Sequence, residues 1–378
     1  MRLTNVTITV VIMVITMAIA SCSHFGLNAS GDNDSIAVKK PLKGDDNINR
    51  ATSFYAGISK EGITMSDVDS KAWDEYSQEI NKMLAIGADA RNKMDSLASA
   101  DFKDFRDKVD LVFYPFSGAD FLYPIILYPD ADIFILCGLE KTGAPIGTNI
   151  KTDYKQYNSY RTALKSFLKH SYFITLMMKD DLDNTEIDGV CPVLSMLMAT
   201  AKCDIISIEN MMFDDKGKVV PAQGDGNVTK YKFFKKGSSH EQTLYYISTN
   251  LRNTDLDPKF LAFLNNTLPK HNVGTYLKAA SYMLHWNTFT TIRNCILDNS
   301  ISIIQDDSGI AYRNFDDRFE ITLYGTYKRP LPSFDKRTYQ PDLMTAYTDN
   351  ADKVKPLPFH IGYSEPSNWL CARRKAGK

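Results

Sequence analysis

The chain has 378 residues, of which 44% are hydrophobic and 24% are charged, and its formal net charge at neutral pH is −1. These values are typical of globular proteins, and the length allows one large or two modest domains. A net charge near zero provides no basic footprint for nucleic acid, so no nucleic-acid partner is expected.

The first residues have the pattern of an export signal. Arg2 precedes an uncharged, mostly apolar stretch from Val6 to Ala20. This stretch is short for a bilayer-spanning helix but suits the apolar region of a secretory signal. Residues 1–21 are therefore predicted to be a signal peptide rather than a membrane anchor helix.

The four residues Ile19-Ala20-Ser21-Cys22 resemble the lipobox of bacterial lipoproteins. The resemblance implies that Cys22 carries acyl chains such as palmitate, becomes the mature N-terminus and tethers an exported protein to the lipid bilayer of the cell envelope. A stable anchor needs more than one chain, since each buried methylene contributes only about 0.8 kcal/mol. Because Ser23 is not the Asp that retains enteric lipoproteins at the inner membrane, the outer membrane is the expected location.

Two segments separate the leader from the main domain. Residues 22–50 are predicted to be a flexible tether, because they are rich in Gly, Asn, Asp, Lys and Ser and nearly free of large apolar groups. Residues 51–108 are predicted to be a helical segment packing on the main domain, since apolar residues recur three and four apart from Ser66 to Phe105.

Residues 109–378 are predicted to form an α/β domain with an extended C-terminal tail from Lys328. Short β-branched and aromatic runs predict strands at 109–116, 133–139, 204–208, 229–234, 243–248, 301–305 and 319–327. Helical spacing predicts helices at 154–178, 193–201, 258–268, 276–285 and 289–297. The alternation predicts a mostly parallel, doubly wound sheet with an antiparallel C-terminal strand pair.

Over residues 109–330, the order of predicted elements resembles a Rossmann-like or class I methyltransferase-like domain. A strand, the turn Ser117-Gly118, a helix and a second strand ending at Glu140 follow that order. The resemblance does not extend to the glycine fingerprint, because Asp120 and Phe121 stand where the backbone would approach a phosphate. It therefore implies a fold but no nucleotide cofactor, and the cofactor stays unknown.

Three further stretches, FYPFSGADFLYP, LYGTYKRPLP and PLPFHIGY, resemble an uncharacterised family of bacterial proteins. This resemblance implies one continuous domain and no particular reaction.

The candidate site residues follow the predicted strands. Ser117 is a candidate nucleophile without an evident base, and Asp120 either caps the next helix or faces a ligand, with capping favoured. Asp306, Asp307 and Ser308 end a strand, where parallel sheets bind ligands, although a plain turn is the favoured interpretation. Together Asp120, Glu140 and Asp306 could hold a hard cation.

The sequence contains no complete short motif for catalysis or metal binding. There is no G-x-S-x-G elbow, H-E-x-x-H is interrupted by Leu244, and the five cysteines beyond Cys22 include no C-x-x-C pair. A disulfide between Cys191 and Cys203 is one possibility in an oxidising envelope. The absence of these motifs favours an envelope protein that binds a small molecule or a partner. The alternative is an envelope hydrolase or transferase that uses acidic residues at strand ends.

Overall fold

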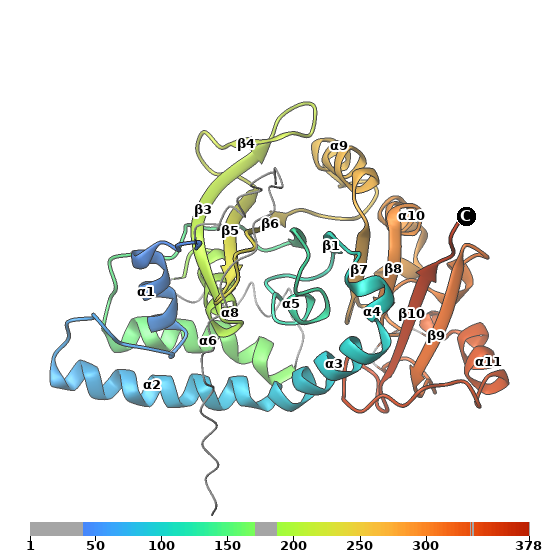
Figure 1. The fold of residues 1–378 in the computed structure, drawn as a ribbon, viewed down its shortest axis with the longest axis horizontal. Helices are drawn as coiled ribbons and strands as arrows, with labels where there is room; N and C mark the ends of the chain where they lie inside the picture. The colour runs from blue at the N-terminus through green and yellow to red at the C-terminus, as the bar shows by residue number, and fades with distance from the viewer. Residues whose placement is uncertain (1–40, 171–186, 333, 335, 378) are drawn as a thin grey trace, which may run out of the picture. The chain divides into compact units, whose positions relative to one another are not determined.

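The computed structural model describes residues 41–170, 187–332, 334 and 336–377, and the predicted signal peptide, lipobox and most of the tether lie outside them. In this part of the chain ten strands form one sheet in the order β4-β3-β5-β6-β2-β1-β7-β8-β10-β9 (Figure 1). The strands are β1 Leu111–Tyr114, β2 Ile133–Gly138, β3 Cys203–Phe213, β4 Val219–Pro221, β5 Val228–Lys235, β6 Gln242–Ser248, β7 Val273–Leu277, β8 Ser300–Gln305, β9 Phe319–Gly325 and β10 Asn368–Arg374.

The sheet is mixed, so the prediction of a mostly parallel, doubly wound, Rossmann-like sheet is wrong. Strands β6, β2, β1, β7 and β8 run parallel to one another. Antiparallel pairings join β4 to β3, β3 to β5 and β5 to β6 on one side, and β10 to β8 and β9 on the other. Five of the nine pairings are thus antiparallel, and the fold is α/β with a mixed sheet.

Helices cover both faces of the sheet, because alternate residues of a strand point to opposite sides. Val112 and Tyr114 of β1 belong to one hydrophobic core, and Leu111 and Phe113 belong to the other. The first core is closed by α1 Asp46–Tyr55, α2 Asp67–Ile86, α3 Ala88–Asp101, α4 Lys103–Arg106, α5 Pro124–Leu127, α6 Tyr154–His170 and α8 Cys191–Thr200. The second is closed by α9 Pro258–Thr267, α10 Thr290–Asn299 and α11 Pro341–Asp349.

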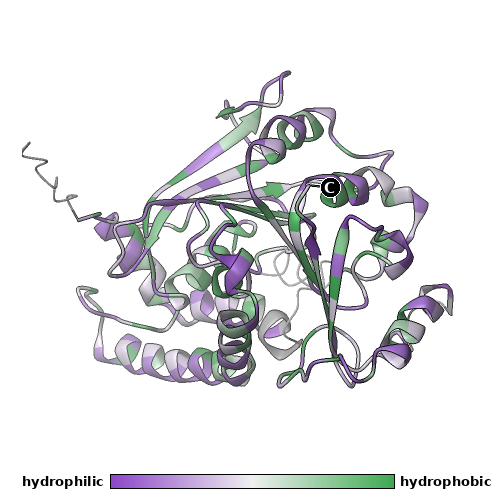
Figure 2. Ribbon diagram, turned by 45° about the vertical axis from the view of Figure 1, so that its right-hand side comes forward, coloured by the Kyte–Doolittle hydropathy of each residue, from purple (hydrophilic) through white to green (hydrophobic). Residues whose placement is uncertain are grey.

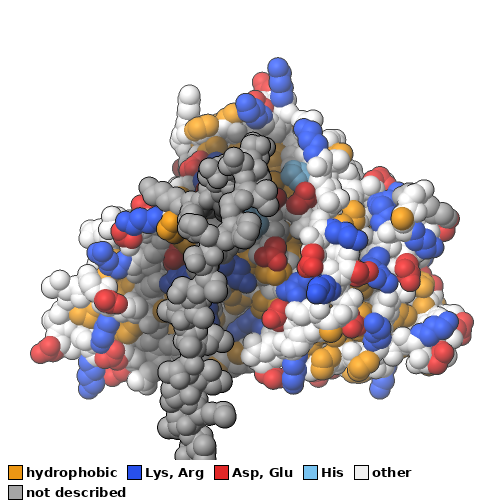
Figure 3. All heavy atoms as spheres, in the orientation of Figure 1, with side chains coloured by type: hydrophobic (Ala, Val, Ile, Leu, Met, Phe, Trp, Pro, Cys, Tyr) orange, Lys and Arg blue, Asp and Glu red, His pale blue; other side chains and the backbone are white. Residues whose placement is uncertain are grey.

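The hydropathy, charge and burial of the side chains can be compared with this arrangement. Figure 2 shows hydrophobic and hydrophilic residues along both the strands and the helices. Figure 3 shows cationic and acidic side chains interspersed over one face, in keeping with the net charge of −1. The prediction of a buried central strand at 111–116 is confirmed for 111–114, because β1 lies between β2 and β7 and is buried throughout.

The ordered fold begins earlier than residue 51. Asp45 caps α1 by accepting from the backbone N–H groups of Asn47 and Ile48, and its own N–H donates to the Ile205 carbonyl at 2.8 Å. The Asn49 side chain also binds the backbone of Ile205, donating at 2.9 Å and accepting at 2.8 Å. Residues 45–49 therefore bind the backbone of β3 and belong to the domain rather than to the tether.

The helices predicted between Ser66 and Phe105 are present as α2, α3 and α4. Ser66 caps α2 by accepting from the N–H of Asp69, and Gly87 is the C-cap that follows the last helical residue, Ile86. The helix predicted at 154–178 is α6 as far as His170, and the rest of it lies outside the described residues. No described helix combines the length and the apolar character that a membrane crossing requires.

Two predictions for the second half of the domain are wrong. The segment predicted as a helix at 276–285 instead completes β7, continues as a loop and ends in a single 3-10 turn, Met283–His285. The tail from Lys328 contains α11 and β10, and β10 lies between β8 and β9. The strands predicted at 301–305 and 319–327 are therefore not paired with each other.

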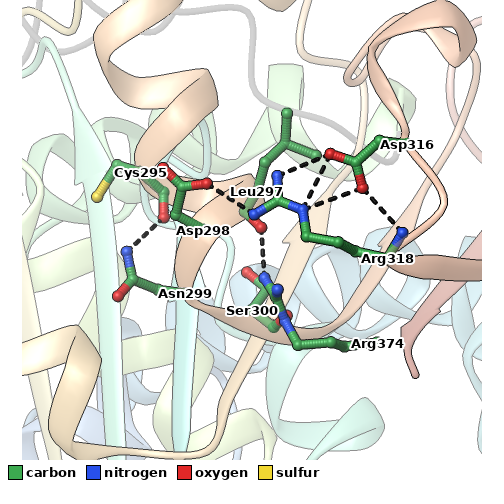
Figure 4. A network of polar contacts seen from close by, with 8 residues as sticks. All are labelled: Cys295, Leu297, Asp298, Asn299, Ser300, Asp316, Arg318 and Arg374. Atoms are coloured by element: carbon green, nitrogen blue, oxygen red, sulfur yellow. Dashed lines mark hydrogen bonds and ion pairs between the residues drawn. The ribbon is translucent and has the colours of Figure 1, made fainter. Parts of the chain in front are cut away.

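A polar network fixes the end of β10 to the end of α10 (Figure 4). Arg374 donates to the backbone carbonyl of Ser300 at 3.0 Å and to that of Leu297. Arg318 forms ion pairs with Asp298 and Asp316 at 3.0 and 2.9 Å. Cationic side chains at a helix C-terminus satisfy its last carbonyls, so this network secures the inserted strand.

Candidate functional site

The sequence-predicted residues gather at the carboxyl edge, by which we mean the carboxyl ends of the parallel strands β6, β2, β1, β7 and β8. Ser117 and Asp120 follow β1, Glu140 follows β2, and Asp306, Asp307 and Ser308 follow β8. All six side chains are buried. The edge is the expected place for a ligand in parallel α/β sheets, and the contacts of each residue decide what it can do there.

Asp120 forms a buried ion pair and does not cap a helix. The helix that follows begins at Pro124, and its N-cap position is held by Tyr123 without a side-chain cap. The Asp120 carboxylate instead lies 2.5 Å from the ammonium of Lys278, which directly follows β7, and accepts from the Tyr114 hydroxyl at 3.1 Å. Burial raises the pKa of Asp120, and the charge of Lys278 opposes that shift.

One side of this ion pair is left without a partner. Within the described residues, Asp120 Oδ1 and the Tyr276 hydroxyl are buried and form no hydrogen bond. The Tyr276 ring packs edge-on against Tyr114 with centroids 4.9 Å apart, and burial together with the charge of Asp120 raises the pKa of the Tyr276 hydroxyl. Leaving a buried polar group unpaired costs about 1–3 kcal/mol, so two such groups together need an explanation.

The backbone after Lys278 is strained. Ala279, Ser281 and Tyr282 have φ angles of 52°, 54° and 59°, in the left-handed region that L-residues other than Asn and Asp rarely adopt. Each such residue costs about 1–2 kcal/mol. We name residues 278–282 the strained loop.

Asp306 and Ser308 hold the strained loop in place. Asp306 accepts from the N–H of Ala279 at 3.0 Å, and the Ser308 hydroxyl accepts from the N–H of Ala280 at 2.8 Å. Asp306 also accepts from the Ser308 hydroxyl at 2.5 Å. Burial and the charge of Asp307 raise the pKa of Asp306 above its ordinary range. These residues support the loop, so the favoured sequence interpretation of a plain turn understates their role.

Asp307 anchors the C-terminal segment instead. Its carboxylate accepts from Tyr282 at 2.7 Å and from Ser364 and Asn368 at 2.9 Å each. These three hydrogen bonds join the strained loop, through Tyr282, to the segment leading into β10, through Ser364 and Asn368.

Ser117 and Glu140 form separate contacts. The Ser117 hydroxyl donates to the carbonyls of Gly118 and Cys137 at 3.0 and 3.2 Å, and no base contacts it among the described residues. The Tyr246 hydroxyl donates to the Glu140 carbonyl at 3.0 Å and lies 3.3 Å from its carboxylate. Ser117 therefore lacks what a nucleophile needs, which is a base within hydrogen-bond reach.

Metal and disulfide chemistry receive no support from this geometry. In residues 41–170 and 187–377, apart from 333 and 335, no three His, Cys, Asp or Glu side chains are grouped so that they could hold a metal ion. Asp120, Glu140 and Asp306 thus do not form the hard-cation site considered from the sequence. Cys191 and Cys203 are both buried free thiols, so the disulfide considered between them is not formed.

The sequence did not indicate Lys278 or His285, whose ring packs against Tyr282 of the strained loop with centroids 5.3 Å apart. Lys278 is hidden because its strand was predicted to be a helix, and a lysine after a strand has no signature of its own. His285 is buried, neither ring nitrogen has a hydrogen-bond partner in the described part of the chain, and burial lowers its pKa to about 4.

Comparisons with family models, with curated proteins and with solved structures found no match to this chain.

Proposed function

We propose that the chain is a lipoprotein of the bacterial cell envelope, anchored through acylated Cys22, whose α/β domain binds a ligand at the carboxyl edge. The anchor is supported by the short apolar leader and by Ile19-Ala20-Ser21-Cys22. Ser23 supports the outer membrane as its location. Scarcity of large apolar residues after Cys22 supports a tether that holds the domain away from the bilayer.

The observation that supports ligand binding is the strained loop together with the Asp120 carboxylate, of which one oxygen, Oδ1, has no hydrogen-bond partner among the described residues. Three left-handed residues follow β7, and the two unpaired buried polar atoms are Asp120 Oδ1, after β1, and the Tyr276 hydroxyl, at the end of β7. Strain of this kind persists where the surrounding structure enforces it, and it concentrates at ligand-binding positions. A hydroxyl or amine that donates to Asp120 Oδ1 and contacts the Tyr276 hydroxyl would satisfy both atoms.

Binding is favoured over hydrolysis or group transfer. The acids proposed for catalysis are engaged elsewhere, since Asp306 supports the strained loop and Asp307 binds the C-terminal segment. Ser117 donates to carbonyls and has no base. The carboxyl edge therefore supplies polar recognition without an activated nucleophile.

The anchor is tested by metabolic labelling with palmitate in the wild type and in Cys22→Ala. We expect label in the wild type and none in the variant, which should accumulate as a precursor. Equal labelling of both proteins, with equal partition into detergent, would show that Cys22 is not the anchor.

The ligand is tested by native mass spectrometry of the protein purified from its own envelope. We expect a small-molecule adduct on the wild type that is lost in Asp120→Asn, because the amide offers no charge to the ligand. The exposed Asp352→Asn is the matched control and should keep the adduct. An adduct retained in Asp120→Asn, or absent from the wild type, would contradict ligand binding at this edge.

A further inference from the structure

A basic pocket lies among α3, α4, α5 and the turn that joins α8 to β3, on the face that carries the first core. Its cavity volume is about 280 Å³, and its charged lining consists of Arg91, Arg106, Lys235 and Asp95. One wall is apolar and is formed by Leu122, Ile125, Ile126 and Pro129. The pocket thus combines cations with a hydrocarbon surface.

Among the described residues, only one of the three cations forms an ion pair with a carboxylate. Arg106 pairs with Asp95 at 3.1 Å and donates to the Ile126 carbonyl at 2.7 Å. Arg91 donates to the Leu84 carbonyl at 2.7 Å, and no described carboxylate forms an ion pair with Arg91 or with Lys235. A concave site with three cations and one lining carboxylate, Asp95, has a net positive charge and attracts an anion.

The pocket lies close to the place where the tether enters the fold. Lys235 pairs with Cys203 across β5 and β3, and two residues further along β3 the Ile205 carbonyl accepts from the N–H of Asp45. Two residues of a strand span about 7 Å. The proposed tether, as a flexible chain of about 20 residues with a root-mean-square length of about 25 Å, would keep this region near the bilayer that the proposed anchor at Cys22 enters.

We propose that the basic pocket binds the phosphate-bearing headgroup of an anionic phospholipid. Arg91 and Lys235 hold the phosphate, since guanidinium and ammonium groups are the side chains that bind phosphate oxygens in proteins. The apolar wall receives the glycerol and the first methylenes of the acyl chains. The proposal rests on the proposed function for the nearness of a membrane, but not for the chemistry of the pocket.

The test is native mass spectrometry of the full chain in non-ionic detergent, with dihexanoyl phosphatidylglycerol, dihexanoyl phosphatidylcholine or inorganic phosphate added. We expect the wild type to bind phosphatidylglycerol in preference to the other two probes. Arg91→Gln/Lys235→Gln should weaken that binding about 30-fold, which corresponds to about 1 kcal/mol for each cation. Lys216→Gln/Lys218→Gln makes the same charge change at the exposed β3–β4 turn and should bind like the wild type.

Lys235→Gln alone covers the case in which the double variant does not fold, and it should still weaken binding several-fold. Equal binding of the two lipids, or full binding by the Arg91 and Lys235 variants, would overturn the proposal. So would tight binding of inorganic phosphate without any lipid adduct, because the pocket would then be a site for a free phosphate. An unacylated Cys22 would overturn the anchor while leaving this lipid measurement intact.

Discussion

The buried ion pair between Lys278 and Asp120 should dominate the stability of the carboxyl edge. The two charged groups are 2.5 Å apart, and their side chains are 1% and 0% exposed. Lys278→Met removes the ammonium and leaves a buried carboxylate without its counter-charge. We expect this variant to lower the free energy of unfolding by about 3–5 kcal/mol at neutral pH, the usual cost of breaking a buried pair.

The cost should shrink in acid. Without Lys278, the burial of Asp120 is opposed only by the Tyr114 hydroxyl and the charge of Arg91, so the pKa of Asp120 in the folded variant rises further above the unfolded value. A carboxyl whose folded pKa is raised loses stability as the pH increases through that range, and regains it as the pH falls. Lys278→Met should therefore approach the wild type in stability below about pH 4, near the unfolded carboxyl pKa.

A double-mutant cycle measures the interaction by urea unfolding followed by tryptophan fluorescence. Lys278→Met/Asp120→Asn should be more stable than the sum of the single effects predicts, by about 1–3 kcal/mol. The control is the exposed pair Lys259–Asp215, at 2.7 Å with side chains 42% and 93% exposed, whose coupling should be much smaller than that of the buried pair. Additive effects at the buried pair would refute the reasoning.

Three further outcomes are expected. Phe113→Ala, in the middle of β1 and fully buried, should cost about 3–5 kcal/mol in urea unfolding. Lys202→Gly should stabilise by about 1 kcal/mol in the same assay, because Lys202 has a φ of 60° just after α8, where glycine is preferred. His285 has a folded pKa of about 4 against an ordinary 6.5, so its own contribution to stability should fall by about 3 kcal/mol from pH 6.5 to pH 4, measured as the difference between the wild type and His285→Leu. A His285→Leu variant that keeps the full wild-type slope over that range would exclude His285 as its cause.

The carboxyl-edge position of Ser117, Asp120, Glu140 and Asp306 could be predicted because each follows a short apolar run. Such runs become buried strands, and parallel neighbours end at the same edge. Their contacts could not be predicted. Asp120 is paired with Lys278, a residue distant in sequence, and no local pattern specifies a partner brought close only by the packing of β1 beside β7.

The sequence pattern predicts a helix at the end of β7 for a physical reason. Val273–Leu277 is buried on both faces, so it shows no alternation of polar and apolar residues. The apolar residues Tyr276, Ala280 and Leu284 recur four apart, which is the spacing of a helix. The insertion of β10 was equally hidden, because its place between β8 and β9 depends on pairing with residues far along the chain.

The central claim is that a ligand satisfies the carboxyl edge between β1 and β7. Crystals of the protein purified from its own envelope test it most directly, through the electron density beside Asp120 Oδ1 and the Tyr276 hydroxyl. We predict density larger than a water molecule, with a polar atom within hydrogen-bond distance of both groups. A single ordered water bridging them, or no density at all, would contradict the claim and reduce the strained loop to a structural feature of the fold.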